Sequence, residues 1–464
     1  MKRLVMLAGI PALFLSSCLF GPNYAGPGDS GLPSTWQNAL PPASTEHDLS
    51  AWWGAFGDNQ LNNLLSQAFA ANPDMINAAL AIDKAESQLR EQKADLFPSL
   101  GINIGGANSG NFNTSTSHGK WNGGLSASWT PDIWGGTRRR VEAAFASLGS
   151  SVAAEGATRT ALASGIATTY FEWISAQESL RLALEQLEYQ ERTYRITKER
   201  KENGFESGLD LAQAESVIAS TRAQLPAYRA TIRTCEATLA TYLGTTPDQV
   251  HLSMPSASVY NKIPQVPTGL PSDLLRRRPD IIRAERDLHA ATAQVGASVA
   301  DLFPRISLTG STSASAGTDF AHFFRNATWS LGSSASQTLL NRVSLNEAVR
   351  RADIARLTQY QTYRKTVLAA FAEVEKCLIT YAKLMNQTPE LEKVNDANKR
   401  AADLSLQLYN AGHTDFLNVA SAERAWLSSE LNLITTRQQI RMELAKLCTA
   451  LGGGWDSTRI TTKH

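Results

Sequence analysis

Cys18 is the residue of this sequence whose chemistry is most readily predicted. It follows Leu15-Ser16-Ser17 at the end of a short apolar stretch, and Lys2 and Arg3 stand before that stretch. A basic start, an apolar stretch and small residues before a cysteine are typical of a bacterial lipoprotein signal peptide. We therefore expect residues 1–17 to be removed and Cys18 to carry an N-acyl chain and an S-diacylglycerol. Several acyl chains anchor a protein firmly, whereas one alone is marginal.

The alternative for Cys18 is an ordinary signal peptide with an incidental cysteine. Leu19 follows it, where an aspartate would favour retention in the inner membrane of many bacteria, so we expect the outer membrane. Residues 18–58 then form a lipidated N-terminal segment. This segment is rich in Pro, Gly, Ser and Asn, which predicts an extended chain leading away from the anchor.

A run of three arginines, Arg276-Arg277-Arg278, stands directly before Pro279 and Asp280. Proline suits the first position of a helix, and an acidic residue next to it is stabilised by the helix dipole. Ser272 is placed to cap a first helical turn before the arginines. The run therefore indicates a structural role in orienting the helix that begins at Pro279.

The sequence contains no motif for catalysis or for a metal. It has no GxSxG elbow, no HExxH and no P-loop, and its 7 histidines lack ligand spacing. A net charge of +1 gives no basic surface for nucleic acid. Cys235, Cys377 and Cys448 remain once Cys18 is acylated, so at least one is unpaired, and all fall in helical patterns that favour a small apolar role. We expect no enzyme, no metal and no cofactor beyond the lipid.

The elements that position these residues are arranged twice along the chain of 464 residues. Asp95-Leu96-Phe97-Pro98 recurs as Asp301-Leu302-Phe303-Pro304, and Leu243-Gly244 recurs as Leu451-Gly452. Repeat 1 takes residues 59–260, with a leading helix, two strands and a long helical hairpin. Repeat 2 takes residues 261–464, with a helix after the arginines, two strands, a second hairpin and a tail. Such a duplication is typical of a pseudo-twofold wall element rather than of an enzyme with one cleft.

Each repeat contains two predicted strands. Leu100 and Ile102 alternate with Gly101 and Asn103, a period of two that is typical of strands with one apolar and one polar face. The segments between the paired strands, near 113–120 and 317–325, are interpreted as hairpin loops. The strands are expected at 99–112, 121–131, 305–316 and 327–339.

The strands favour a membrane barrel, with a soluble sandwich as the alternative. Neither Asp, Glu, Lys nor Arg occurs from Ser99 to Gly119, from Trp121 to Pro131 or from Asn326 to Asn341, although a soluble sheet normally carries charges on its exposed face. Strands of about ten residues match the tilted span of an outer-membrane barrel. Four strands cannot close a barrel and open edges are not tolerated in lipid, so three copies are expected to share about twelve strands.

Long helices with a heptad pattern follow the strands, as in a coiled coil. Helices at 137–201, 209–243 and 416–451 are expected to form antiparallel hairpins that turn at Gly204 and Gly412. Pro389 is expected to kink or break the long helix of repeat 2, and a further helix is expected over 59–93. The expected seam of repeat 1 is Ile166, Tyr170, Trp173, Gln177, Leu180, Leu184, Leu187, Glu191 and Tyr194. The expected seam of repeat 2 is Val367, Phe371, Val374, Leu378, Tyr381 and Met385.

These features predict an α+β membrane protein of duplicated β-β-α-α repeats. Four strands per chain contribute to a shared trimeric 12-stranded barrel, and the antiparallel coiled coils form a periplasmic α-barrel. The lipid end and the strands set the direction, so the hairpin turns are expected farthest from the outer membrane.

The chain resembles NodT-type outer-membrane lipoproteins of the TolC/OprM-like outer membrane factor family over essentially its whole mature length. The resemblance rests on the order and spacing of several motifs. They are Gly21-Pro22-Asn23-Tyr24, Trp52-Trp53, Asn72-Pro73-Asp74, Asp95-Leu96-Phe97-Pro98, Asp132-Ile133-Trp134-Gly135, the run from Leu270 to Ile281, and Leu451-Gly452-Gly453-Gly454-Trp455.

The resemblance implies a homotrimer in the outer membrane that extends into the periplasm. It implies the passive exit duct of a tripartite efflux system of the resistance–nodulation–division type, for small molecules and drugs. The implied partners are a periplasmic adaptor protein, an inner-membrane transporter and outer-membrane lipid. The exit duct of a type I protein secretion system is one alternative, and a non-conducting coiled-coil envelope lipoprotein is another.

The resemblance also implies a gate where the hairpins taper to a constriction, which carboxylates often line. The two positions where family members often carry aspartate hold Asn418 and Ser421 here, so a strongly cation-selective ring is not expected. Asp415 is the nearest replacement, and Asp210 is its rough counterpart in repeat 1. The alternative to pore lining, for both aspartates, is a structural role at the start of the helix that follows each turn. The adaptor is expected to contact these hairpin ends.

Overall fold

The computed structural model describes residues 19–28, 31–38, 49–111, 116–205, 207–260, 262–264, 271–316, 327–340 and 342–456. The chain forms two compact units, and each draws on both halves of the sequence. Unit 1 comprises Met1–Ser30, Leu80–Val152 and Arg283–Thr366, and unit 2 comprises Gly31–Ala79, Ala153–Ile282 and Val367–His464. The predicted signal peptide and Cys18 lie outside the described residues.

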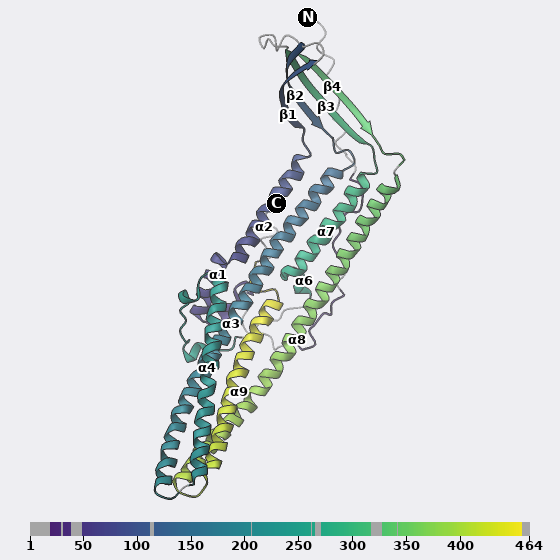
Figure 1. The fold of residues 1–464 in the computed structure, drawn as a ribbon. Helices are drawn as coiled ribbons and strands as arrows, with labels where there is room; N and C mark the ends of the chain where they lie inside the picture. Colours follow the sequence, from purple (N-terminus) through teal and green to yellow (C-terminus); the bar gives the residue numbers. More distant parts are fainter. Residues whose placement is uncertain are drawn as a thin grey trace. The chain divides into compact units, whose positions relative to one another are not determined.

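Unit 1 contains a four-stranded antiparallel sheet, as predicted. Its strands are β1 Ser99–Asn111, β2 Thr116–Trp129, β3 Arg305–Ala316 and β4 Thr328–Ser336, in the order β1-β2-β3-β4 (Figure 1). The pairing runs without a break from Ser99↔Ser128 to Asn111↔Thr116. The sheet therefore has two edges, β1 and β4, that pair with no other described strand.

The predicted loop at 113–120 is wrong, because β2 already begins at Thr116. Lys120, the last residue of the predicted loop, lies inside β2 and pairs with Ala107 of β1. A single lysine near the end of a strand keeps its backbone in the ladder, so one charge does not end a strand. The second predicted loop, 317–325, lies outside the described residues.

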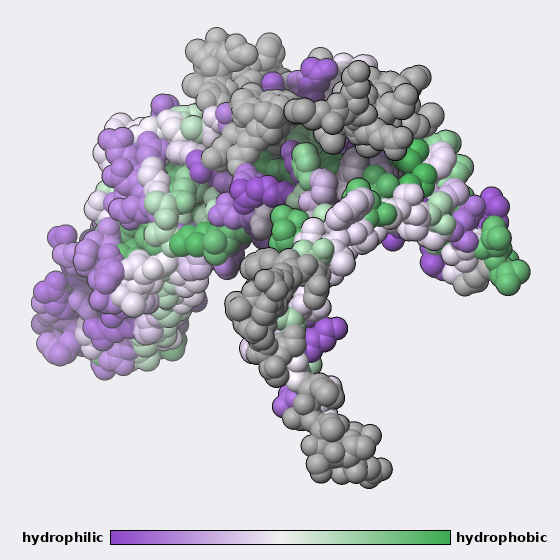
Figure 2. All heavy atoms as spheres, turned by 90° about the horizontal axis from the view of Figure 1, so that it is seen from above, coloured by the Kyte–Doolittle hydropathy of each residue, from purple (hydrophilic) through white to green (hydrophobic). Residues whose placement is uncertain are grey.

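One face of the sheet exposes large apolar side chains. Leu100 is 74% exposed and Ile104 is 77% exposed, and Trp329 and Leu331 of β4 are similarly open. Successive residues of a strand point to opposite faces, so the intervening glycines, serines and asparagines lie on the other face. Hydrophobic residues reach the surface beside hydrophilic ones in Figure 2. The alternation predicted for the strands is thus present in the fold.

Helices make up most of the remaining structure. The predicted helix over 59–93 is wrong in one respect, because it is divided at Asn72. The Asn72 side chain accepts hydrogen bonds from the backbone N–H groups of Asp74 and Met75, at 2.8 and 3.2 Å, and Pro73 begins the second helix. The long helices are α1 Asn59–Ala71, α2 Pro73–Ala94, α3 Gly136–Glu202, α4 Gly208–Leu243, α7 Pro279–Ala300, α8 Arg342–Asn410 and α9 Phe416–Ala450. The short ones are η1 Leu49–Phe56, η2 Pro247–Gln249, α5 Ala257–Tyr260, η3 Pro271–Asp273 and α6 Leu274–Arg277.

The hairpin helices have the predicted bounds to within one residue. Helix α8 continues through Pro389 and α4 continues through Pro226, so the break considered at Pro389 does not occur. A proline removes one backbone hydrogen bond. In α8 the helix continues despite that loss, and Leu384 and Asn395, on either side of Pro389, are buried. Among the described residues, no helix is both long and apolar enough to cross a membrane.

The predicted seam of α3 is right at its start and wrong further on. Ile166, Tyr170 and Trp173 are fully buried in unit 2, and the Tyr170 hydroxyl donates to Oδ2 of Asp58 at 2.7 Å. Leu184, however, is 42% exposed. The side chains buried along the rest of α3 are largely polar: Gln186, Gln190, Thr193 and Thr197.

The repeat 2 seam departs from the prediction in the same way. Val374 and Leu378 are buried, but beyond them Leu384 is buried and Met385 is exposed. In both hairpins the buried residues move to another face of the helix on the way to the turn. The heptad spacing of apolar residues did not predict this change.

Candidate functional site at the ends of the helical hairpins

Each hairpin of unit 2 has a turn that joins its two helices, α3 to α4 in one hairpin and α8 to α9 in the other (Figure 1). The two turns are similar. Gly204 has φ 80° and Gly412 has φ 78°, a left-handed conformation that favours glycine. The Phe205 N–H donates to the Arg200 carbonyl, and the His413 N–H donates to the Leu408 carbonyl, at 2.8 and 2.9 Å. Both turns are Schellman motifs, which satisfy the last carbonyls of α3 and α8.

The two predicted aspartates occupy different positions at the helix starts that follow. Ser207 is the N-cap of α4, and Asp210 closes a capping box by accepting the Ser207 N–H at 3.2 Å. Asp415 is itself the N-cap of α9, and its side chain caps no backbone N–H. The offset that relates Gly204 to Gly412 therefore relates Ser207 to Asp415 and Asp210 to Asn418. The expected correspondence of Asp210 with Asp415 is wrong by one helical turn, because Asp210 lies at the third residue of its helix.

Asp415, Asn418 and Ser421 share one exposed face at the start of α9. Their spacing of three residues places them on one side of the helix, whereas Phe416, Val419 and others face inward. The Asn418 side-chain amide also donates to Oγ1 of Thr414 at 2.8 Å. The exposed face thus carries one carboxylate, one amide and one hydroxyl. Asp210 lies outside this face, and its carboxylate is engaged in the capping box.

Tyr409, which sequence reasoning did not single out, holds the two hairpins of one chain together. It is completely buried at the end of α8, and its hydroxyl donates to Oγ1 of Thr197 on α3 at 2.9 Å. Nη1 of Arg200 on α3 donates to the Tyr409 carbonyl at 2.9 Å, and the guanidinium lies 4.9 Å from the centre of the tyrosine ring. We call Thr197, Arg200 and Tyr409 the latch.

An apolar cluster lies next to the latch. Tyr409 packs edge-on against Phe416, with the ring centres 5.9 Å apart. The cluster also contains Ala214 of α4 and Val419 and Ala420 of α9. All four helices of the hairpins therefore meet at this level. An aromatic residue three positions before the turn glycine was the available sequence signal, but the hydrogen-bond partners of Tyr409, Thr197 and Arg200, lie on the other hairpin.

The arginine run lies elsewhere in unit 2 and makes structural contacts. Arg278 binds Asp280 through Nη2 at 2.8 Å and Glu373 of α8 through Nη1 at 2.8 Å. Nη1 also donates to the carbonyl of Ala450 at the end of α9. Burial alone would lower the pKa of Arg278, but the pairs with Asp280 and Glu373 raise it above its ordinary value. Arg278 therefore joins the start of α7 to α8 and α9.

The residues next to Arg278 in the sequence differ from it in exposure and in contacts. Arg276 and Arg277 are exposed, and the Arg277 carbonyl accepts a 2.7 Å hydrogen bond from Nε1 of Trp455. Pro279 is the first residue of α7, as predicted, and Asp280 lies in its first turn. Ser272 is not a helix cap, because it lies inside the short helix Pro271–Asp273 and Asp273 takes the N-cap position of α6.

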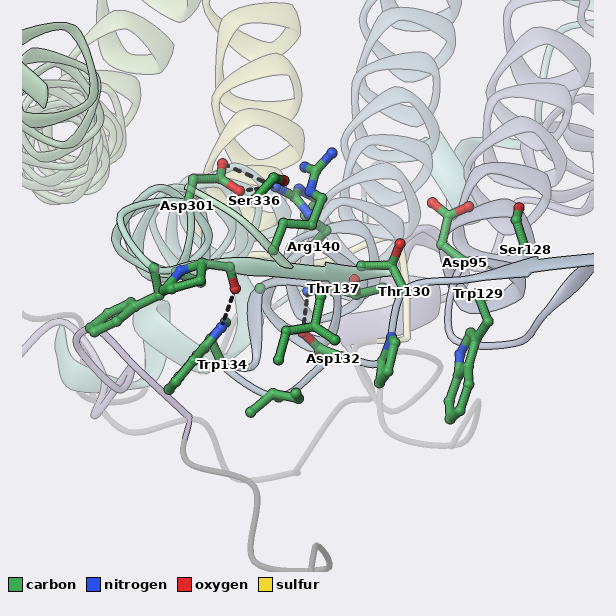
Figure 3. A pocket seen from close by; sticks show the side chains of 18 of the residues that line it. Asp95, Ser128, Trp129, Thr130, Asp132, Trp134, Thr137, Arg140, Asp301 and Ser336 are labelled. Carbon is green, nitrogen blue, oxygen red and sulfur yellow. Dashed lines mark hydrogen bonds and ion pairs between the residues drawn. The ribbon is translucent and has the colours of Figure 1, made fainter. Parts of the chain in front are cut away.

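Unit 1 contains an open cavity of about 990 Å³ at the base of the sheet. Both Asp-Leu-Phe-Pro copies line it, through Asp95 and Asp301 among others. Arg140 binds both carboxylate oxygens of Asp301, at 2.9 and 3.1 Å. In Figure 3, Asp95 points to one side of this region, with Ser128 and Thr130, whereas Trp129 and Trp134 point to the other. The duplicated motif thus joins the strands to the helices with one polar and one aromatic side.

The predicted inert role of the cysteines agrees with their surroundings. Cys235, Cys377 and Cys448 are free and buried, and burial raises the pKa of each thiol to about 12. Within the described part of the chain, no group of three or more His, Cys, Asp and Glu side chains is placed to hold a metal ion.

Comparison with known proteins connects this architecture to a family. The family model described as "outer membrane efflux protein" matches residues 64–245 and 270–453. The pyoverdine export outer membrane protein OpmQ of Pseudomonas aeruginosa is 32% identical over 99% of this chain and 98% of its own. Nodulation protein T of Rhizobium leguminosarum bv. trifolii is 29% identical over 96% of each chain. The solved structure of the outer-membrane channel OprN is similar with a TM-score of 0.85 and 28% identity, over 94% of this chain and all of that one.

Proposed function

Because the chain belongs to the outer membrane efflux protein family, we propose that three copies form one passive exit duct for small molecules across the outer membrane and periplasm. The protein is the outer-membrane component of an efflux system. The three copies would share a 12-stranded barrel, with duplicated hairpins continuing it as a helical tunnel. A periplasmic adaptor and an inner-membrane transporter of the resistance–nodulation–division type would complete the assembly.

The single observation on which the proposed trimer rests is that the sheet of one chain is too small to close into a barrel. Strands β1 and β4 are both edges, and large apolar side chains such as Ile104 cover one face. An open edge is not tolerated in lipid, because each unpaired backbone group there costs several kcal/mol. Pairing β1 of one copy with β4 of the next would remove every edge and turn the apolar face to lipid. This closure supports a shared barrel.

Exposed apolar residues on α8 support the same assembly in unit 2. A single soluble chain rarely leaves so many large apolar side chains open along one helix. A neighbouring copy packed against α8 would bury them. The residues concerned are Leu368, Ile379, Val394, Leu404 and Leu408.

The experiment that tests this function combines mass and conductance. Protein purified from membranes in mild detergent is expected to have the mass of three chains and to form ion-conducting channels in a planar bilayer. A folded, membrane-embedded monomer would contradict the shared barrel. A trimer that never conducts, even with the latch removed, would favour a structural envelope lipoprotein instead.

The exposed face of Asp415, Asn418 and Ser421 is the proposed lining of the periplasmic opening, together with Asp210 and the turns at Gly204 and Gly412. One carboxylate per chain on this face would give a weaker preference for cations than two or more would. The adaptor would dock on the same hairpin ends.

Cys18 is proposed to carry the lipid anchor. Cys18→Ala is expected to abolish incorporation of labelled palmitate and to leave the uncleaved precursor, because the acylated cysteine is the cleavage site of a lipoprotein signal. Metabolic labelling followed by mass spectrometry of the N-terminus measures both. Cys235→Ala is the matched control and should be labelled like the wild type. Normal processing of Cys18→Ala would indicate an ordinary signal peptide.

A further inference from the structure

Glu423 of α9 is a carboxyl group buried without a partner. It is only 1% exposed, and its Oε1 atom receives no hydrogen bond from the described residues. A buried polar group is normally hydrogen-bonded, and a buried charge is normally paired. Glu423 lies one turn beyond Val419 and Ala420, which belong to the cluster where the four hairpin helices meet. Its ionisation state therefore bears on the packing of the hairpin ends.

The duplication shows what Glu423 lacks. The offset that relates Gly204 to Gly412 relates Glu215 of α4 to Glu423. Glu215 is exposed and accepts a 3.1 Å hydrogen bond from the hydroxyl of Tyr194. The residue of repeat 2 that corresponds to Tyr194 is Ala402, which is itself buried. The second hairpin thus keeps the glutamate, turns it inward and has no tyrosine to donate to it.

Polar groups of α3 also lack partners, among them the hydroxyl of Tyr189, whose pKa Glu423 influences. The Tyr189 hydroxyl, Gln190 Oε1 and Gln186 Nε2 are buried without hydrogen bonds from the described residues. Burial, with smaller contributions from Glu423 and Asp403, raises the pKa of Tyr189 to about 12, so the phenol remains neutral. Ionising Glu423 would place a charge in a buried region where the described residues donate no hydrogen bond to its Oε1 atom.

No cation neutralises Glu423 in the described structure. Arg222 is paired with Glu191 at 2.6 Å, and Lys399 lies over the ring of Trp426. Arg424 donates to the carbonyl of Ala420 in its own helix. The titratable groups that face this level from the four helices are Tyr189, Glu191, Arg192, Glu215, Arg222, Lys399, Asp403 and Arg424.

We propose that Glu423 is a proton-binding site that couples periplasmic acidity to the packing of the hairpin ends. With a proton bound, Glu423 is neutral and the four helices remain close-packed. With the proton lost, the unpaired charge draws water inward and loosens α9 from α3 and α8. This inference rests on the proposed function in one respect, since loosening the hairpin ends opens the duct only if they form its gate.

The pH range follows from the burial of Glu423, which raises its pKa from 4.5 to about 7. A raised pKa means that the packed state binds the proton more tightly than the loosened state. The stabilisation of the packed state is complete below the ordinary pKa and is lost as the pH rises through about 7. Between pH 5.5 and 8 this linkage amounts to about tenfold or more in the ratio of loosened to packed ends.

Hydrogen–deuterium exchange of the purified trimer tests the proton site without relying on conductance. Peptides from the first turns of α9 should exchange about tenfold faster at pH 8 than at pH 5.5, after correction for the intrinsic rate. Glu423→Gln removes the proton-binding group at the same size and should make exchange independent of pH. Glu215→Gln is the matched control in repeat 1 and should retain the wild-type dependence.

Each outcome decides between the proposals. Equal wild-type protection at the two pH values would overturn the proton site, as would a Glu423→Gln protein with the wild-type dependence. The wild-type comparison is sufficient should Glu423→Gln fail to assemble. Bilayer conductance is recorded in parallel and should rise with pH in the wild type and in Glu215→Gln, but not in Glu423→Gln. A pH-dependent exchange with no conductance in any variant would contradict the exit duct and leave the proton site supported.

Discussion

Arg200→Ala is expected to increase the bilayer conductance of the protein by at least about tenfold. Arg200 donates a charged hydrogen bond to the Tyr409 carbonyl and lies against its ring, joining α3 to α8 at the hairpin ends. A hydrogen bond from a charged group contributes about 1.5–3 kcal/mol, and about 1.4 kcal/mol changes a population tenfold. Removing it should favour separated hairpins. Single-channel recording measures the fraction of time spent in the open state.

Lys201→Ala is the matched control for the latch. Lys201 belongs to the same turn of α3 and carries the same charge, but its side chain is exposed and has no partner among the described residues. Tyr409→Phe removes only the hydroxyl bonded to Thr197 and should give a smaller increase than Arg200→Ala. If Arg200→Ala and Lys201→Ala conduct alike, the latch does not hold the gate.

Ile104→Arg is expected to prevent insertion into the outer membrane. Ile104 lies on the apolar face of β1 and is 77% exposed in the single chain. An arginine on the lipid face near the middle of the bilayer costs about 2–4 kcal/mol, and in a trimer the cost falls on three copies. Together these costs are comparable with the whole stability of a typical domain. The amount of heat-resistant trimer in the outer-membrane fraction measures the effect.

Asn103→Arg supplies the control for this strand. Asn103 precedes Ile104, pairs with Gly124 and points to the opposite, polar face of the sheet. The same charge is expected to be tolerated there, with normal amounts of trimer and an altered ion preference. Equal loss of trimer in both variants would mean that the apolar face of the sheet does not face lipid.

Some departures from prediction had signals in the sequence. Asn72 followed by Pro73 is a helix cap with proline at the first position, and the structure begins α2 there. Ser207 followed three residues later by Asp210 is a capping pair, which fixes the position of Asp210 in its helix. These local interactions involve neighbours in the sequence, so the chain itself contained the information.

The sequence by itself determined the strands, the long helices, their turns and their order. These depend on alternation, heptad spacing, glycine and proline, which act over a few residues. Only the tertiary structure decided which side of each helix faces inward near the turns. Each helix there has several neighbours, so burial depends on partners distant in sequence. Hence Leu184 is exposed, Thr197 and Tyr409 meet across two hairpins, and Glu423 is buried whereas its counterpart Glu215 is not.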